Sequence, residues 1–335
     1  MIFIRTDANE HIGIGHVMRC NSIARAFIKK GEKVTFITAD HKGDALIIDF
    51  PVICLDSTWN RMDSEIDKMI ELINHEKPKF LLIDSYSITK KYFKEITTMV
   101  PTAYMDDMNA NRWDVDYIIN YNIFANTLDY SWYEKTRTKL LLSPQFTPLR
   151  EEFRDSPEFE IKLVKHILVS AGGADPEKVT ERILESICPK YPDAVFHFIV
   201  GALNPRIDII HSLAGNNVVL HLNEHNMSGL MQNCDIAISA AGTTLYELCA
   251  IGIPTITFTL ADNQLIAAEQ FDKQGIMLCA GDCRNDEGFI GRIEELLDEL
   301  RNDDALRKKL SEKMRKQIDG LGADRIVDEL LRLKQ

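Results

Sequence analysis

The sequence lacks the long apolar runs and the leader segment that mark membrane and secreted proteins. Its longest apolar runs, such as Phe80–Ile83 and Ile256–Leu260, fall well short of the roughly 18 consecutive apolar residues that a membrane-spanning helix needs. The stretch Met1–Asp7 becomes polar before it could form the apolar core of a signal peptide, and it has no basic leader. We therefore expect no membrane span and a cytoplasmic location.

The sequence also lacks a cysteine pattern of the kind that forms disulfides or zinc sites. Its seven cysteines include no C-x-x-C pair, and their number is odd. Cys279 and Cys283 are the closest two in sequence, yet no nearby histidine completes a zinc-binding pattern. Unpaired cysteines are typical of a reducing compartment. We expect reduced, structural thiols.

Positive charge is scarce. The 335 residues contain 39 Lys and Arg against 51 Asp and Glu, a formal net charge of −12. Because there is no basic tract, the chain lacks the electrostatic footprint of nucleic-acid binding, and we expect no nucleic-acid partner. Any phosphate must then be bound by local groups. Hydrophobic residues make up 45% and charged residues 27% of the chain, which is ordinary globular usage, and the length suits about two domains.

Short β-rich runs alternate with helical patterns along the chain, which predicts an α/β fold with parallel sheets. In the first half we expect strands at 2–6, 33–38, 52–55, 80–83, 103–105 and 117–120. The first helix, about His16 to Lys30, places apolar residues on one face at steps of three and four, and Gly31 is its stop signal. In the second half we expect strands at 167–170, 195–200, 218–222, 236–239 and 255–259, and helices at 178–187, 207–213, 227–232, 243–250 and 264–273.

The alternation loosens between Leu140 and Arg154, where two prolines interrupt it. We place a domain boundary there, so that residues 1–150 form an N-terminal domain and residues 151–335 a C-terminal domain. From Asp286 onwards the chain is helical and highly charged, and we expect this tail to pack on the outside. The fold class is therefore α/β, with two doubly wound, Rossmann-like domains. Because ligands bind at the carboxyl ends of such strands, two facing domains predict one cleft.

The first candidate motif, residues 7–19, follows the first strand and opens the first helix. Gly13 and Gly15 let the backbone approach a ligand, and a helix N-terminus favours an anion. Met18 stands where a dinucleotide fingerprint needs its third glycine, so NAD and FAD are disfavoured. The alternative is a tight strand-to-helix turn. His16 favours the functional interpretation, because the helix dipole there favours the neutral imidazole that can act as a general base.

The second candidate motif, residues 239–247, also joins a strand to a helix. The backbone N–H groups of the turn at Gly242 and the hydroxyls of Thr243 and Thr244 can hold a diphosphate without a lysine. Glu247 lies one turn further, on the face it shares with Thr243, where its carboxylate can accept both hydroxyls of a ribose. The alternative is a well-capped core helix with an exposed glutamate.

Two further loops follow strand ends of the second half. Gly172 and Gly173 permit close backbone approach to a sugar diphosphate, and Asn263 and Gln264 at a helix start offer amide donors. Together with the turn at Gly242, these loops describe a nucleotide-sugar pocket.

Polar residues also end two strands of the first half. Tyr86, just after the fourth strand, can orient a sugar or polarise its hydroxyl, although a tyrosine that caps a strand edge is equally common. Asp106 and Asp107 end the fifth strand, but without D-x-D spacing or a companion histidine they indicate a turn rather than a metal site. We expect no metal and no cofactor, and we assign no chemical role to the other eight histidines.

A family pattern runs through these motifs, in the segments IRTDANEHIGIGHVMR (4–19), LLIDSY (81–86), DD (106–107), LREEF (149–153), SAGGAD (170–175) and AAGTTLYE (240–247). From residue 1 to about residue 275, the sequence resembles the PseG-type UDP-sugar hydrolases of pseudaminic acid synthesis. That family resembles the GT-B glycosyltransferases, notably MurG, with UDP held by the C-terminal domain. One departure is Ser85, where some members have histidine.

The resemblance implies hydrolysis of UDP-2,4-diacetamido-2,4,6-trideoxy-β-L-altropyranose to UDP and the free sugar, without a metal. By position, it implies that His16 is the general base, that Tyr86 is a required neighbour, and that Arg150, Glu247 and Asn263 bind substrate. The full set that we expect to bind the UDP-sugar is Gly13, Gly15, Arg19, Arg150, Gly172, Gly173, Gly242, Thr243, Thr244, Glu247, Asn263 and Gln264. Two alternatives stay open: a glycosyltransferase that uses the same UDP pocket, and a non-catalytic nucleotide-sugar sensor.

Overall fold

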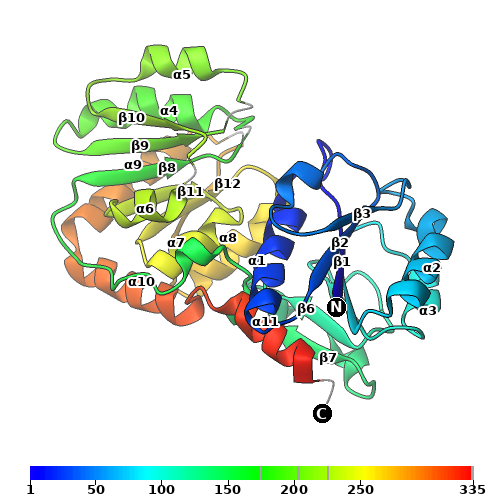
Figure 1. Ribbon diagram of the computed structural model, residues 1–335. Coiled ribbons are helices and arrows are strands. Elements are labelled where there is room, and N and C mark those ends of the chain that lie inside the picture. The colour runs from blue at the N-terminus through cyan, green and yellow to red at the C-terminus, as the bar shows by residue number, and fades with distance from the viewer. Residues whose placement is uncertain (174, 202–203, 225, 285, 333–335) are drawn as a thin grey trace. The chain divides into compact units, whose positions relative to one another are not determined.

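The computed structural model describes residues 1–173, 175–201, 204–224, 226–284 and 286–332. The chain divides into two compact units, and each is an α/β unit with helices around a parallel sheet (Figure 1). Unit 1 comprises Met1–Glu151 and Gly320–Gln335, and unit 2 comprises Glu152–Asp319. None of the helices in the described ranges is both long and apolar enough to cross a membrane.

The division corrects the expected place of the C-terminal tail. We expected all residues after 150 to lie in one domain, whereas α11 (Gly322–Leu331) belongs to unit 1 and packs on α1 (Gly15–Lys29). The hydroxyl of Tyr117 donates to the carbonyl of Glu329 at 2.6 Å. At the start of the helix, a Cβ on Gly322 would meet the carbonyl oxygen of Thr147 at 2.1 Å. Close backbone packing that the sequence pattern does not reveal therefore fixes α11 to unit 1.

In the described part of unit 1, the sheet has seven parallel strands in the order β3-β2-β1-β4-β5-β6-β7. The six expected strands are present within about one residue of their expected bounds. β7 was missed because it is an edge strand in the loosened stretch, where Lys139 is exposed and only Leu141 is buried. The strands are β1 (Ile2–Thr6), β2 (Val34–Thr38), β3 (Val52–Cys54), β4 (Phe80–Asp84), β5 (Thr102–Met105), β6 (Tyr117–Asn120) and β7 (Lys139–Leu142).

The helices of unit 1 bury one face each against this sheet. In α1, the expected face of Val17, Cys20, Ile23, Ala24 and Phe27 is fully buried. The chain leaves the helix through Gly31, whose φ of +78° is the left-handed conformation that glycine adopts without strain. The other helices are α2 (Ile66–Glu76) and α3 (Lys90–Ile96), with short 3-10 turns at Asp44–Leu46, Met62–Glu65, Ala125–Thr127, Ser131–Tyr133, Pro144–Phe146 and Glu151–Phe153.

In the described part of unit 2, six parallel strands have the order β10-β9-β8-β11-β12-β13. They are β8 (His166–Ser170), β9 (Val195–Val200), β10 (Val218–Leu222), β11 (Ile236–Ala240), β12 (Thr255–Thr259) and β13 (Leu278–Asp282). The pattern missed β13, whose sequence LCAGD contains glycine and no β-branched residue. The helices are α4 (Val179–Ser186), α5 (Ile207–Leu213), α6 (Met227–Gln232), α7 (Thr244–Ile251), α8 (Asp262–Lys273), α9 (Phe289–Asn302) and α10 (Asp304–Gln317), with a 3-10 turn at Cys188–Lys190.

Much of the charged tail is part of the core rather than an outer addition. Ile293, Leu297 and Leu300 of α9 are fully buried and join the hydrophobic cluster that the strands of unit 2 form. α9 contacts both β12 and β13. Its charged residues lie between these buried positions, as in an amphipathic helix that covers a sheet.

Each sheet has one point where the chain order reverses. In unit 1 this point lies between β1 and β4, and in unit 2 it lies between β8 and β11. Loops that leave neighbouring strands in opposite directions open a crevice at the carboxyl ends, which is where parallel α/β sheets bind ligands. The fold therefore singles out the loops after β1 and β4, and those after β8 and β11.

Candidate functional site

A buried histidine and a buried carboxylate meet at the reversal point of unit 1. His16 lies in the first turn of α1, and Asp84 is the last residue of β4. His16 Nδ1 lies 2.6 Å from Asp84 Oδ1, and both side chains are almost completely buried. Because a carboxylate accepts, Nδ1 carries the proton in this pair, and the neutral form of the ring then has its lone pair on Nε2. This is the arrangement of a general base that a carboxylate orients.

Arg19 also holds this carboxylate, and its Nη2 lies 3.1 Å from His16 Nδ1. Its Nε donates to Asp84 Oδ2 and its Nη2 donates to Asp84 Oδ1, each at 2.6 Å. Arg19 and Asp84 therefore form a bidentate ion pair. Burial alone would raise the pKa of Asp84, but Arg19 and then His16 hold that pKa well below its usual range. Asp84 therefore stays ionised and available to the imidazole.

A second carboxylate, Asp107, orients Tyr86. The Tyr86 hydroxyl donates to Asp107 Oδ2 at 2.7 Å, and Arg19 Nη1 donates to the same oxygen at 2.9 Å. The Tyr86 ring meets the His16 ring edge-on, with centroids 4.6 Å apart, while 57% of the residue remains exposed. Burial and the negative charge of Asp107 raise the pKa of Tyr86, so the phenol keeps its proton at neutral pH. Tyr86 thus presents a neutral hydroxyl beside the imidazole.

The loop before His16 is a hydrogen-bonded turn with open space beside its two glycines. Asn9 Oδ1 accepts from the backbone N–H groups of His11 and Ile12, at 2.9 and 3.1 Å. Gly13 has a φ of +73°, and a Cβ on Gly13 or on Gly15 would meet nothing within 4 Å. The glycines therefore close a tight turn, as one interpretation held, and they also keep the approach to the start of α1 clear.

The sequence identified part of this network. His16, Arg19 and Tyr86 were singled out and lie together, whereas Asp84 was given no role and Asp107 was interpreted as a turn residue rather than a metal ligand. A carboxylate at the end of the buried run FLLID was the signal that could have revealed Asp84. Arg19 was expected to contact substrate, but its three side-chain nitrogens bond to side chains of unit 1, including the Tyr121 hydroxyl at 2.8 Å.

Asp106 behaves as the turn residue that the sequence indicated. Its Oδ1 accepts from the backbone N–H groups of Met108 and Asn109, at 3.2 and 2.8 Å. Burial raises the pKa of this carboxyl. Asp106 therefore stabilises the loop that carries Asp107.

Three of the expected binding loops lie side by side in unit 2. They follow β8, β11 and β12, which are consecutive neighbours in the sheet. Gly172 has a φ of +77°, and a Cβ on Gly172, Gly173 or Gly242 would meet nothing within 4 Å. Ala174, in the first of these loops, lies outside the described residues. At the carboxyl edge of unit 2, the loops beside the reversal of strand order between β8 and β11 therefore contain glycines with open space next to their backbone.

The start of α7 has the form of an anion site. Thr243 is exposed at the N-cap and makes no side-chain cap hydrogen bond there, and Thr244 begins the helix. The first N–H groups and the dipole of a helix favour a negative charge at this end. Glu247 is half-buried in the first turn, four residues after Thr243 and therefore on the same face.

The remaining expected residues have mixed surroundings. Asn263 is exposed at the start of α8, whereas Gln264 uses its Oε1 to accept from the backbone N–H of Leu260 at 2.8 Å. The Gln264 amide oxygen is therefore used within the loop between β12 and α8. Arg150 is half-buried, one residue before the last residue of the first segment of unit 1.

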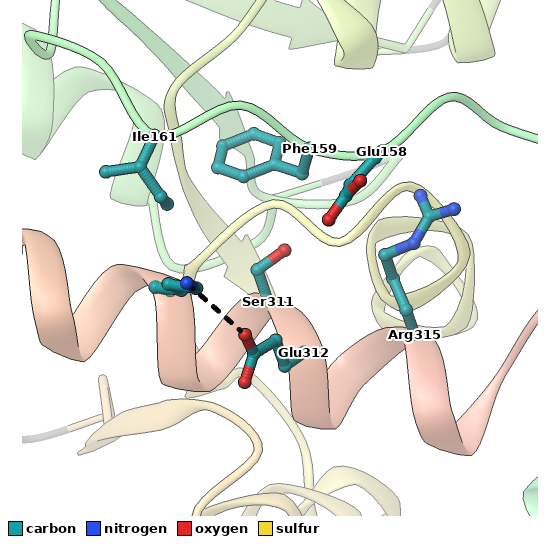
Figure 2. Close-up of a pocket in the computed structure, with 7 residues that line it drawn as sticks. Glu158, Phe159, Ile161, Ser311, Glu312 and Arg315 are labelled. Carbon is teal, nitrogen blue, oxygen red and sulfur yellow. Dashed lines mark ion pairs between the residues drawn. The ribbon is translucent and has the colours of Figure 1, made fainter.

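A separate cavity of about 560 Å³ lies beside α10. Figure 2 shows Phe159 and Ile161 on the segment before β8 and Ser311, Glu312 and Arg315 on the helix. Arg315 donates to the carbonyls of Ser156 and Pro157 at 2.7 Å each, which ties this segment to α10. None of the expected binding residues is among the described residues that line this cavity.

Comparison with known proteins shows which domain family and which solved structures the chain resembles. Residues 198–328 match the model of the glycosyltransferase family 28 C-terminal domain. The structure is similar to the crystal structure of MurG from Acinetobacter baumannii, with a TM-score of 0.72 at 12% identity over 99% of both chains. The chain has the GT-B fold. The expected fold class, two Rossmann-like domains of this type, is confirmed.

Relatives of similar sequence are distant. The spore coat polysaccharide biosynthesis protein SpsG of Bacillus subtilis is 24% identical, over 96% of this chain and 95% of its own length. The UDP-2,4-diacetamido-2,4,6-trideoxy-β-L-altropyranose hydrolase of Campylobacter jejuni is 23% identical, over 82% of this chain and 97% of its own. An uncharacterized protein of Methanocaldococcus jannaschii is 25% identical over 79% of this chain, which spans only 56% of that relative.

Proposed function

We propose that this protein is a UDP-sugar hydrolase that releases UDP from UDP-2,4-diacetamido-2,4,6-trideoxy-β-L-altropyranose or a close analogue. The observation that carries the proposal is the His16–Asp84 pair, at 2.6 Å, with the Tyr86 hydroxyl beside it at the reversal point of unit 1. A base of this kind serves a reaction in which a proton must be removed from water. The similarity to the Campylobacter jejuni hydrolase supports this choice of substrate.

In this mechanism the leaving group is UDP. As the bond between the anomeric carbon and the phosphate oxygen stretches, positive charge develops at that carbon. His16 Nε2 takes a proton from a water molecule, the water oxygen bonds to the anomeric carbon, and the electron pair of the broken bond leaves with UDP. Asp84 stabilises the imidazolium that forms. Displacement by water implies inversion at the anomeric carbon.

The two units have different parts in the reaction. Unit 2 binds UDP, with the diphosphate on the loops at Gly172 and Gly242 and the start of α7, and the ribose on Glu247. Unit 1 supplies His16, and Tyr86 donates a hydrogen bond to the sugar. Arg150 and Asn263 complete substrate binding. Fixed N–H dipoles carry the charge of the leaving group, so the reaction needs no metal.

The test is UDP release from a panel of UDP-sugars with no acceptor present. A hydrolase releases UDP at a steady rate and favours the diacetamido sugar. The match of residues 198–328 to a glycosyltransferase domain favours a second candidate, a glycosyltransferase, which would release UDP only when an acceptor is added. UDP binding without turnover under either condition would identify a nucleotide-sugar sensor.

A further inference from the structure

A second group of chemically distinctive side chains lies in unit 1, at the ends of β2 and β3. His41, Cys54 and Asp56 each place one nitrogen, sulfur or oxygen atom within 4.8 Å of the other two. His41 and Asp56 are exposed, and Cys54 is half-buried. The sequence gave no reason to join them, because Cys54 has no cysteine or histidine close to it in the chain.

The backbone holds these residues in place. Thr38 at the end of β2 pairs in register with Cys54 at the end of β3. Beyond the strands, the N–H of Leu55 donates to the carbonyl of Thr38 at 2.9 Å, and the N–H of Ser57 donates to the carbonyl of Ala39 at 2.8 Å. The loops that carry the three side chains are therefore tied together directly after Cys54, on both sides of Asp56.

Two of the three potential ligands, His41 and Cys54, also have a supporting partner. Asp44 Oδ2 lies 2.7 Å from His41 Nδ1, and Asp44 Oδ1 accepts from the Thr38 hydroxyl at 3.2 Å. The backbone N–H of Asp56 donates to Cys54 Sγ at 3.4 Å. A carboxylate on the far nitrogen of a histidine is the outer contact that orients metal ligands, and an N–H bonded to sulfur stabilises a thiolate.

We propose that His41 Nε2, Cys54 Sγ and a carboxylate oxygen of Asp56 bind one Zn²⁺ ion, with water as the fourth ligand. Zinc accepts mixed nitrogen, sulfur and oxygen donors, at about 2.0 Å from nitrogen or oxygen and about 2.3 Å from sulfur. In a tetrahedron, such donors lie roughly 3.3 to 3.7 Å apart, so donors now within 4.8 Å need only a small side-chain movement. Binding releases the Cys54 thiol proton to solvent.

The donor set selects against other common ions. Magnesium and calcium prefer oxygen ligands, and a thiolate with an imidazole is a poor match for either ion. The site lies outside the His16 network, because none of its three ligands bonds to that network among the described contacts. The ion joins the loops after β2 and β3, and it has no part in the proposed hydrolysis.

The test is a titration of the full-length, reduced protein with Co²⁺, which replaces zinc and reports its ligands by absorption. We expect a thiolate-to-cobalt charge-transfer band and the intense visible bands of tetrahedral Co²⁺, both abolished by one equivalent of Zn²⁺. Cys54→Ser should remove the charge-transfer band. His41→Ala and Asp56→Asn should weaken binding at least ten-fold, and Asp44→Asn about 10- to 100-fold.

Matched controls are Cys279→Ser, at a half-exposed cysteine of unit 2, and His75→Ala, at an exposed histidine of α2. Both should bind Co²⁺ as the unaltered protein does. No tetrahedral spectrum at millimolar Co²⁺, or a charge-transfer band that survives Cys54→Ser, would overturn the proposal. So would unchanged affinity in both His41→Ala and Asp56→Asn, whose exposed side chains can be replaced without unfolding the unit.

Discussion

The carboxyl edges of the two sheets present different groups: side chains in unit 1 and mainly backbone in unit 2. In unit 1 the edge is a network of polar and charged side chains, in which His16, Arg19, Asp84 and Asp107 bond to one another in buried or half-buried positions. In unit 2 the edge consists of glycine turns and the starts of helices, where backbone is left open. Fixed side chains suit proton transfer, and bare backbone suits a diphosphate. In the function that we propose, unit 1 therefore carries out the chemistry and unit 2 binds UDP.

The largest expected effect is at His16. We expect His16→Asn to lower kcat by about 10² to 10⁴, the typical contribution of a general base, with little change in UDP affinity. Steady-state kinetics and calorimetric titration with UDP measure the two quantities separately, and His75→Ala is the control. A variant that keeps more than half of the wild-type rate would remove His16 from the mechanism and end the contrast between the units.

Asp84 tests whether the carboxylate acts through the histidine. Asp84→Asn keeps the shape but replaces the acceptor of Nδ1–H, so the imidazole loses its orientation and its stabilised charge. We expect kcat to fall by about 10² or more while UDP affinity is kept. Asp107→Asn changes a partner of Tyr86 and of Arg19 but no contact of His16 itself, so it should cost less. Equal losses in the two variants would mean that the network acts only as a structural unit.

In unit 2 the largest effect is expected at Glu247. Glu247→Ala should remove one or two charge-assisted hydrogen bonds to the ribose, each worth about 1.5 to 3 kcal/mol. UDP affinity should fall by one to two orders of magnitude, seen as a raised KM with a modest change in kcat. Glu269→Ala, which removes an exposed carboxylate of α8, is the control. Unchanged affinity in a folded Glu247→Ala variant would place the pocket on another helix.

A substitution at Gly201 tests, with a smaller expected effect, whether the Gly172–Gly173 loop binds the diphosphate. A Cβ at this position would meet the carbonyl oxygen of Gly173 at 2.6 Å. Gly201→Ala should therefore displace the loop after β8 and weaken UDP binding several-fold. At Gly215 the nearest atom to such a Cβ is a side-chain oxygen at 3.6 Å, which is ordinary contact, so Gly215→Ala is the control. If the two variants bind UDP equally well, the Gly172–Gly173 loop does not hold the diphosphate.

The smallest expected effect is that of chelation. EDTA should leave turnover unchanged, because backbone dipoles in unit 2 carry the charge of the diphosphate. The proposed zinc site is independent of this result, since its readout is the Co²⁺ spectrum. Loss of turnover that Mg²⁺ restores would require a metal at Asp106 and Asp107 after all.

The same contrast explains what the sequence could reveal. The loops of unit 2 to which we assign UDP binding are local patterns, in which small residues stand between a strand and a helix, so the sequence alone locates these turns. The network of unit 1 joins residues such as His16 and Asp84, which are 68 positions apart, and only the strand order brings them together. The edge strands β7 and β13 were missed because edge strands need little apolar pattern. The place of α11 depends on close packing of Gly322 against the backbone of Thr147, and the apolar periodicity of the sequence does not predict such a contact.

The most direct test of the central claim is hydrolysis in H₂¹⁸O followed by ³¹P NMR and mass spectrometry of the released UDP. Attack of water on the anomeric carbon breaks the carbon–oxygen bond, so the bridging oxygen leaves with the phosphate. The account predicts UDP without ¹⁸O, formed with no acceptor present and lost in His16→Asn. UDP that carries ¹⁸O on its terminal phosphate would mean attack at phosphorus, and it would contradict the mechanism proposed for unit 1.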